Sequence, residues 1–267
     1  MAPIRLRIIC AVCFLLLNAP WSYAADALNP KPTPEDWAAL GRLPDFSGSW
    51  QPDVMDWMRK SNTEPVPWNA EAGAQIKALR DAEAAGRPRG VHNTCLPLGM
   101  PGSMMINFNL LEFLFTPGRI TMLGETDGNI LRRIYTDGRS HPAPNELTFY
   151  GHSTARWDGS VLVVDTANVR PETELSLNES VGIANGGSMH VIERFRLAAP
   201  DTLEDALEIT APKVLTAPWK TTRLFYRHRE RTHDIVEGIC AEDTVDKVDE
   251  GGNAVFDLTF PQRSEEH

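Results

Sequence analysis

The sequence lacks several features that would assign it to a common class of protein. Only four of its 267 residues are cysteines, and no Gly-x-Ser-x-Gly motif or glycine-rich phosphate loop before a helix is present. The longest apolar run, residues 8–18, is shorter than the roughly 18 to 20 residues that a membrane-spanning helix needs. These absences disfavour a serine hydrolase, a nucleotide-dependent enzyme and a helical membrane anchor.

The N-terminus has the three parts of a secretory signal. Arg5 and Arg7 supply positive charge, residues 8–18 form a short apolar core, and Ser22 to Ala24 place small residues where a signal peptidase cleaves. We therefore expect the signal peptide 1–24 to be removed after Ala24, which predicts a periplasmic or secreted protein. An uncleaved membrane anchor is the alternative, and the short apolar core argues against it.

Removal of this signal leaves an acidic chain with the length of one domain. Residues 25–267 number 267 − 24 = 243, and loss of the two arginines changes the net charge from −10 to −10 − 2 = −12. Since β domains of about 200 to 250 residues are common, we expect 25–267 to form a single domain. The negative charge argues against nucleic acid or an anionic membrane surface as a partner, and we expect no membrane insertion after signal removal.

Two cysteines are left in the mature chain, and we expect them to form one disulfide. Cys95 and Cys240 lie far apart in sequence, in a compartment where thiols oxidise. In the chain-entropy model, closing a loop of about 145 residues stabilises the fold by roughly 4 to 5 kcal/mol. Two buried free thiols are the alternative, and a catalytic thiol has less support because neither cysteine has a basic neighbourhood.

Turn signals at intervals of about ten residues indicate an all-β fold after residue 110. The dipeptides at 117–118, 127–128 and 158–159 are Pro-Gly, Asp-Gly and Asp-Gly, and each separates two apolar or β-branched runs. Gly48 followed by Trp50 is typical of the first strand of a lipocalin-like barrel, where the tryptophan closes one end. We expect an antiparallel lipocalin-like (calycin-type) barrel of about 8 to 10 strands. Strands are predicted near 111–116, 119–126, 129–136, 147–157, 160–168, 189–197, 203–210, 220–229, 233–240 and 253–259.

A helical segment is predicted before the barrel, over about 33–90. A weak capping box favours a short helix at 33–40. Residues 69–85 are rich in alanine, Asn69 is placed to cap a helix, and Gly86 is placed to end it. This second helix should be the longest in the chain.

Several short sequence motifs, spread over nearly the whole mature chain, carry a resemblance to other proteins. They are Pro44 to Gly48, Cys95 to Pro101, Arg132 to Arg139, Gly151 to Ser153, Arg156-Trp157, Leu162 to Thr166, His190 to Phe195 and Pro218-Trp219. Together they resemble a family of exported bacterial proteins of unknown function. The resemblance implies export and a lipocalin-like barrel, and it carries no established activity to these positions.

The hairpin at 150–166 supplies the candidate catalytic residues. A two-residue turn at 158–159 pairs positions whose numbers sum to 317, which places His152 opposite Asp165. Opposed side chains have Cβ atoms about 4.5 to 5.5 Å apart, so the imidazole and the carboxylate can hydrogen-bond, which would raise the histidine pKa. On a face inside the barrel, His152 would transfer protons, Asp165 would orient it and Tyr150 would bind the substrate. A structural pair that sets the hairpin register is the alternative.

Three further residues are candidates for substrate binding. Strand alternation sends Arg133 and Tyr135 to one face, and one inward arginine is expected to bind a carboxylate or oxyanion. His190 can reach the pocket from the next predicted strand. On the other face of that strand, Glu193 is an acid among core residues, and we expect it to pair with an arginine of a neighbouring strand.

Metal binding has little support in the sequence. No pair of histidines shows the short spacing of a zinc motif, so we expect no metal site and no cofactor. A metal gathered from distant strands is the alternative. The candidate ligands are His92, His141, His152, His190, His228 and His233.

These patterns lead to a hypothesis of cofactor-free acid–base chemistry. The expected partner is a small, partly apolar organic molecule, aromatic or terpenoid-like, and the expected reaction is of the lyase, hydratase or isomerase type. A periplasmic small-molecule binding protein of the same fold, without turnover, is the first alternative. A structural envelope protein is the second, and it would have a barrel filled by its own side chains.

Overall fold

The structure is a computed structural model, and its residues Pro34–His267 form one compact unit. Two predictions, the signal peptide at 1–24 and the disulfide between Cys95 and Cys240, lie outside the described residues. The structure describes residues 31–87, 96–106, 108–125, 129–144, 146–177 and 181–237, with the strand residues 247–248 and 254–255.

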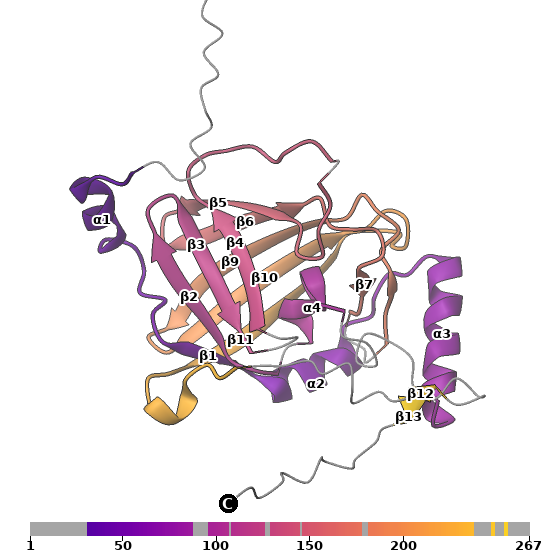
Figure 1. The fold of residues 1–267 in the computed structure, drawn as a ribbon. Helices are drawn as coiled ribbons and strands as arrows, with labels where there is room; N and C mark the ends of the chain where they lie inside the picture. Colours follow the sequence, from indigo (N-terminus) through magenta and orange to yellow (C-terminus); the bar gives the residue numbers. More distant parts are fainter. Residues whose placement is uncertain are drawn as a thin grey trace, which may run out of the picture. The chain divides into compact units, whose positions relative to one another are not determined.

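Nine strands form a closed barrel (Figure 1), which confirms a mostly β fold. The order around the barrel is β1-β11-β10-β9-β6-β5-β4-β3-β2, and β1 pairs with β2 to close it. The strands are β1 (Ser49–Pro52), β2 (Leu111–Thr116), β3 (Arg119–Gly124), β4 (Ile130–Tyr135), β5 (His152–Asp158), β6 (Val161–Ala167), β9 (His190–Ala199), β10 (Thr202–Thr210) and β11 (Trp219–His228).

One strand pair is parallel, so the prediction of a purely antiparallel barrel is wrong. Ile134 of β4 lies beside Ser153 of β5, and Tyr135 beside Thr154, in parallel register. Parallel neighbours need a connection of about a dozen residues or more, and residues 136–151 provide one. This segment carries the chain back to the end of the sheet at which β4 begins. Strand β5 therefore runs in the same direction as β4.

Both predicted helices are present. The first is α1 (Pro34–Leu40) and the longest is α3 (Ala70–Ala84). The Asn69 side chain accepts a hydrogen bond of 2.9 Å from the backbone N–H of Ala72, which is the predicted cap. Two helices were not predicted, α2 (Val54–Thr63) and the wholly buried α4 (Gly99–Met105). The sequence of α4 contains two glycines and a proline, which are poor helix formers, so it gave no helix signal.

Aromatic side chains form much of the barrel core. Phe46, Phe113 and Phe195 pack edge to face, with ring centroids 5.6 Å apart in each successive pair. Trp50 is fully buried, and its indole N–H donates to the carbonyl of Phe46 at 2.9 Å. The guanidinium of Arg227 lies 4.5 Å from the Trp50 ring centroid, so a cation covers this buried ring.

The predicted strand at 233–240 is wrong in the part that the structure describes. Residues Arg231–His233 form a 3-10 helix, and 234–237 belong to no strand. The edges of β11 are already paired with β1 and β10, so the closed barrel leaves no edge for another strand. Two small sheets complete the fold, β7 (Glu174–Leu175) with β8 (Ile183–Ala184) and β12 (Lys247–Val248) with β13 (Ala254–Val255). No helix in the described part of the chain is long and apolar enough to cross a bilayer.

Candidate functional site

Three histidines and one aspartate meet on the outer face of the barrel. His152 comes from β5, Asp165 from β6 and His190 from β9, whereas His141 comes from the segment 136–151. The two imidazole Nδ1 atoms of His141 and His152 lie 3.0 Å apart, and His141 Nε2 lies 3.2 Å from Asp165 Oδ1. His190 Nε2 hydrogen-bonds the same carboxylate oxygen. We call His141, His152, Asp165 and His190 the histidine cluster.

Solvent reaches this cluster. The side chains of His141, Asp165 and His190 retain 25%, 37% and 43% of their full exposure, and His152 is half-buried. A small molecule can therefore contact the imidazole rings without opening the barrel.

The predicted register of the β5–β6 hairpin is wrong. The turn lies one residue later than predicted, so the partner of each residue is displaced by two positions. His152 lies opposite Ala167, and Asp165 lies opposite Thr154. The turn consists of residues 159–160, with a left-handed glycine (φ +59°) at its first position, instead of 158–159. Both placements are favoured hairpin turns, so the sequence Asp-Gly-Ser does not choose between them. A shift of this size keeps both side chains on one face, and His141 bridges the gap between them.

The predicted location of the pair inside the barrel is also wrong. Ser153 and Thr166, the neighbours of His152 and Asp165 in sequence, are 1% and 0% exposed and point inward. Alternation therefore sends His152 and Asp165 outward. The outward face of β6 also carries Val163, whose apolar character made it resemble an inner face.

The inner face of the same strands holds a buried polar network. Arg132 donates to Glu193 Oε1 at 2.9 Å, to Thr166 Oγ1 at 2.9 Å and to Ser153 Oγ at 3.2 Å, and it also hydrogen-bonds Glu193 Oε2. The Arg132 and Glu193 side chains are 2% and 0% exposed. The prediction that Glu193 pairs with an arginine is confirmed, but the arginine is not on a neighbouring strand, because β6 and β5 separate β9 from β4. The inward arginine is Arg132, and Arg133 lies exposed on the outer face.

A second buried acid accompanies this network. Burial, followed by the nearby Glu193 carboxylate, raises the pKa of Asp205 well above its usual value. Asp205 therefore holds its proton more firmly than an exposed aspartic acid does. The Arg132–Glu193 ion pair and the Asp205 carboxyl group thus lie together out of reach of solvent.

Tyr135 and Arg139 border the histidine cluster. The Tyr135 and His152 rings stack with centroids 5.1 Å apart, and the Arg139 guanidinium lies 3.9 Å from the Tyr135 centroid. Asp137 holds Arg139 through contacts of 2.9 Å to its Nε, and these hydrogen bonds lower the Asp137 pKa. Burial, then the charges of His141 and Arg139, lowers the pKa of His152. The expected rise does not occur, and His152 is a neutral base at neutral pH.

The structure brings together four of the six predicted catalytic and binding residues. His152, Asp165 and His190 belong to the cluster, and Tyr135 stacks on it. Tyr150 instead packs, partly buried, against the hydrophobic core. His141 was missed as a catalytic candidate, because residues outside a strand carry no alternation pattern that would place them.

Three residues that could hold a metal ion lie close together at the end of β11. Potential ligand atoms of His228, Glu230 and His233 all lie within 4.8 Å of one another. These residues are near in sequence, so the signal was present as His-x-Glu-x-x-His. His228 and His233 are separated by four residues, a spacing that zinc sites use, so the prediction that no histidine pair has such a spacing is wrong.

Comparison with known proteins does not assign a family. No protein-family model matches the chain, and no curated protein matches it. The coarse fold, a closed nine-strand barrel with one parallel pair, comes from the structure alone. Inferences about function therefore depend on the geometry of the polar clusters.

Proposed function

We propose that the protein is an enzyme that transfers protons on a small, partly apolar organic molecule, with His152 as the general base. One observation carries this proposal, the continuous contacts from His190 through Asp165 and His141 to His152. Elimination, hydration and isomerisation are reactions of this kind, and side-chain acid–base groups suffice for them.

The contacts define a path for the proton. Asp165 Oδ1 accepts the Nε2–H of His141, which leaves His141 Nδ1 as an acceptor. His152 then donates its Nδ1–H to that atom, so its Nε2 carries the free lone pair. When His152 Nε2 takes a proton from the substrate, the Nδ1 proton can pass to His141, whose new charge lies beside the Asp165 carboxylate. His190 donates to the same carboxylate and holds it in place.

The surroundings favour a substrate with a flat or apolar part and an oxygen that becomes negative. The Tyr135 ring offers apolar surface next to the base, and Arg139 lies against that ring. Arg133, exposed on the same strand face as Tyr135, adds a second positive charge. Cations near a developing oxyanion stabilise the transition state of proton abstraction.

The proposal also covers the cellular location of the protein and the type of its barrel. We place the mature protein in the periplasm or outside the cell, and we assign its barrel to the lipocalin-like type of the exported family that it resembles. Mass spectrometry of the exported protein should show an N-terminus at Ala25 and two oxidised cysteines, Cys95 and Cys240. An uncleaved chain, or two titratable thiols in denaturant, would contradict these parts of the proposal.

Hydrogen–deuterium exchange tests the catalytic role without knowledge of the natural substrate. A panel of small cyclic ketones and enones is incubated with the mature protein in D2O, and NMR follows deuterium uptake at the acidic C–H. We expect exchange faster than in buffer. His152→Gln should slow it by about a hundredfold or more, the usual contribution of a positioned acid or base.

Thr154→Val is the matched control, because Thr154 lies two residues away on the same outward face of β5. It should retain the exchange activity. If the wild-type protein exchanges no panel compound faster than folded His152→Gln, the catalytic role is wrong. Binding of a panel compound without exchange would instead support the alternative of a small-molecule binding protein.

A further inference from the structure

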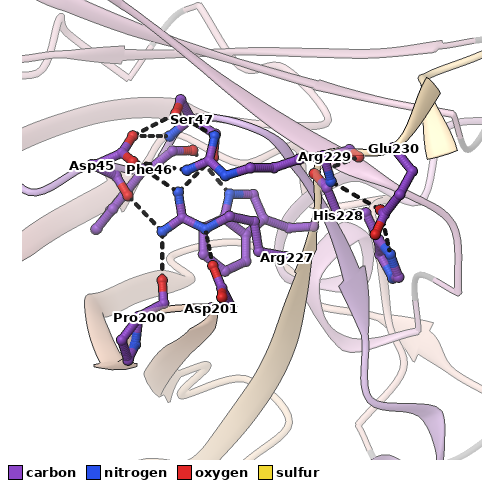
Figure 2. Close-up of polar contacts among 11 residues, drawn as sticks. Asp45, Phe46, Ser47, Pro200, Asp201, Arg227, His228, Arg229 and Glu230 are labelled. Carbon is purple, nitrogen blue, oxygen red and sulfur yellow. Dashed lines mark hydrogen bonds and ion pairs between the residues drawn. The ribbon is translucent and has the colours of Figure 1, made fainter.

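The end of β11 carries a second cluster, separate from the histidine cluster. His228 is the last residue of β11, Glu230 caps the 3-10 helix Arg231–His233, and His233 ends that helix. Glu230 Oε2 lies 3.4 Å from His228 Nδ1 and 3.9 Å from His233 Nδ1. The two imidazole rings stack in parallel, with centroids 4.0 Å apart and planes 5° apart. Figure 2 shows the Glu230 carboxylate beside the His228 ring.

Strand β1 holds this cluster in place. Ser49 pairs with His228 across the sheet, and its hydroxyl donates to the backbone carbonyl of His233 at 2.5 Å. Gln51 Oε1 lies 3.1 Å from His228 Nε2 and accepts a hydrogen bond from its N–H. The turn is therefore tied to the barrel by contacts at both of its histidines.

The Gln51 contact selects the tautomer of His228 that binds metal. A neutral imidazole that donates from Nε2 has its lone pair on Nδ1, and this lone pair points at Glu230 Oε2. Two acceptors then face each other, which a cation between them would stabilise. Metal-bound histidines commonly donate their other ring N–H to an oxygen in this manner.

The spacing and the donor types indicate a particular class of ion. Ligands about 2.0 to 2.1 Å from a tetrahedral ion lie roughly 3.3 Å apart, close to the 3.4 Å and 3.9 Å separations here. Two imidazoles and a carboxylate suit Zn²⁺ and related transition ions better than Mg²⁺ or Ca²⁺. We propose that His228, Glu230 and His233 bind one divalent transition-metal ion of the Zn²⁺ class, with water at the open coordination position.

The nearby positive charges do not oppose this assignment. Arg229 Nη2 lies 2.9 Å from Asp45 Oδ2, and Arg229 also donates to the Ser47 hydroxyl at 3.2 Å. Arg227 lies on the same side and bonds Asp45 and Asp201 (Figure 2). Both guanidinium groups are therefore paired with carboxylates away from the three ligands.

Calorimetric titration of metal-free mature protein with Zn²⁺ tests the proposal. We expect one ion per chain, a visible absorption spectrum of a low-symmetry site when Co²⁺ replaces Zn²⁺, and a rise in Tm on adding Zn²⁺. His233→Ala and Glu230→Gln should each weaken Zn²⁺ binding by more than about a hundredfold, because loss of an outer-shell partner alone costs about 10- to 100-fold. Gln51→Ala should fall in that smaller range.

His190→Ala is the control, since it removes an exposed histidine that contacts a carboxylate elsewhere on the barrel. Its Zn²⁺ affinity should equal that of the wild type. Circular dichroism confirms that each variant is folded, and Glu230→Gln, a change at an exposed residue, keeps the test valid if His233→Ala misfolds. Absence of stoichiometric Zn²⁺ binding would overturn the proposal, as would binding that His190→Ala abolishes and Glu230→Gln leaves unchanged.

Discussion

The same strands carry two polar clusters of opposite character, one on each face. Inside the barrel, Arg132 and Glu193 are almost wholly buried and hydrogen-bonded to each other, and Arg132 also donates to two hydroxyl groups. Outside, His152 and Asp165 belong to a cluster that solvent reaches. Residues adjacent in sequence, such as His152 and Ser153, belong to different clusters because strand side chains alternate between faces.

This comparison separates stability from chemistry. A buried ion pair must remain complete, since removal of one partner leaves a charge in a medium that solvates it poorly. A half-exposed cluster tolerates the gain and loss of protons because water screens the change in charge. We therefore expect variants of the interior to change unfolding and variants of the exterior to change reactivity.

The largest effect on stability should come from Arg132→Met. It leaves Glu193 buried without its cation, and the free energy of unfolding should fall by about 3 to 5 kcal/mol. Arg133→Met, at the next residue but on the exposed face, should change it by less than about 0.5 kcal/mol. Urea denaturation measures both values, and similar losses in the two variants would break the distinction between the faces.

Two glycines that flank β5 should differ in their tolerance of a side chain. A Cβ at Gly151 (φ +66°) would lie 2.5 Å from the carbonyl oxygen of Ala167, whereas a Cβ at Gly159 (φ +59°) would meet open space. Gly151→Ala should destabilise the fold by roughly 2 to 4 kcal/mol, from backbone strain plus the clash. Gly159→Ala should cost about 1 kcal/mol, from the left-handed backbone alone. Thermal unfolding compares them, and equal losses would show that Gly151 does not constrain the chain before His152.

The smallest effect should be a pKa change in the outer cluster. The charge of Arg139 helps to lower the pKa of His152, so Arg139→Gln should raise it toward the ordinary value of about 6.5. NMR titration of the His152 ring measures this, with Arg196→Gln, a surface residue paired with Glu204, as the control. An unchanged or lower His152 pKa in Arg139→Gln would contradict the assigned cause.

The lowered pKa of His152 also determines how the stability of the fold changes with pH. The folded protein binds a proton at His152 at lower pH than the unfolded chain does. Stability from this group is therefore present above pH about 6.5 and declines as pH falls from there toward the lowered pKa. Deuterium exchange by His152 should likewise persist below pH about 6.5 before it declines, because the base acts in its neutral form.

Local patterns in the sequence were sufficient for much of the fold. The cap at Asn69 predicted where α3 begins, and the turn dipeptide at 117–118 predicted the β2–β3 hairpin. The acid at Glu193 among core residues predicted a buried ion pair. Each of these signals depends on neighbours within a few residues or on strand alternation, which the sequence displays directly.

The sequence predicted which residues form much of the candidate site, but it did not predict how they are arranged. His152, Asp165 and His190 were named, but the turn was placed one residue early and the pair was assigned to the wrong face. An Asp-Gly-Ser turn permits two registers, and alternation shows that two faces differ without showing which one lies inside.

By itself, the sequence determined most of the barrel strands, the main helix and which side chains share a strand face, because those properties arise from local periodicity and turn chemistry. Only the tertiary structure decided that the barrel closes with a parallel β4–β5 pair, that Arg132 rather than Arg133 lies inside, and that His141 bridges His152 and Asp165. These outcomes depend on how segments distant along the chain meet, and on which face the rest of the barrel buries.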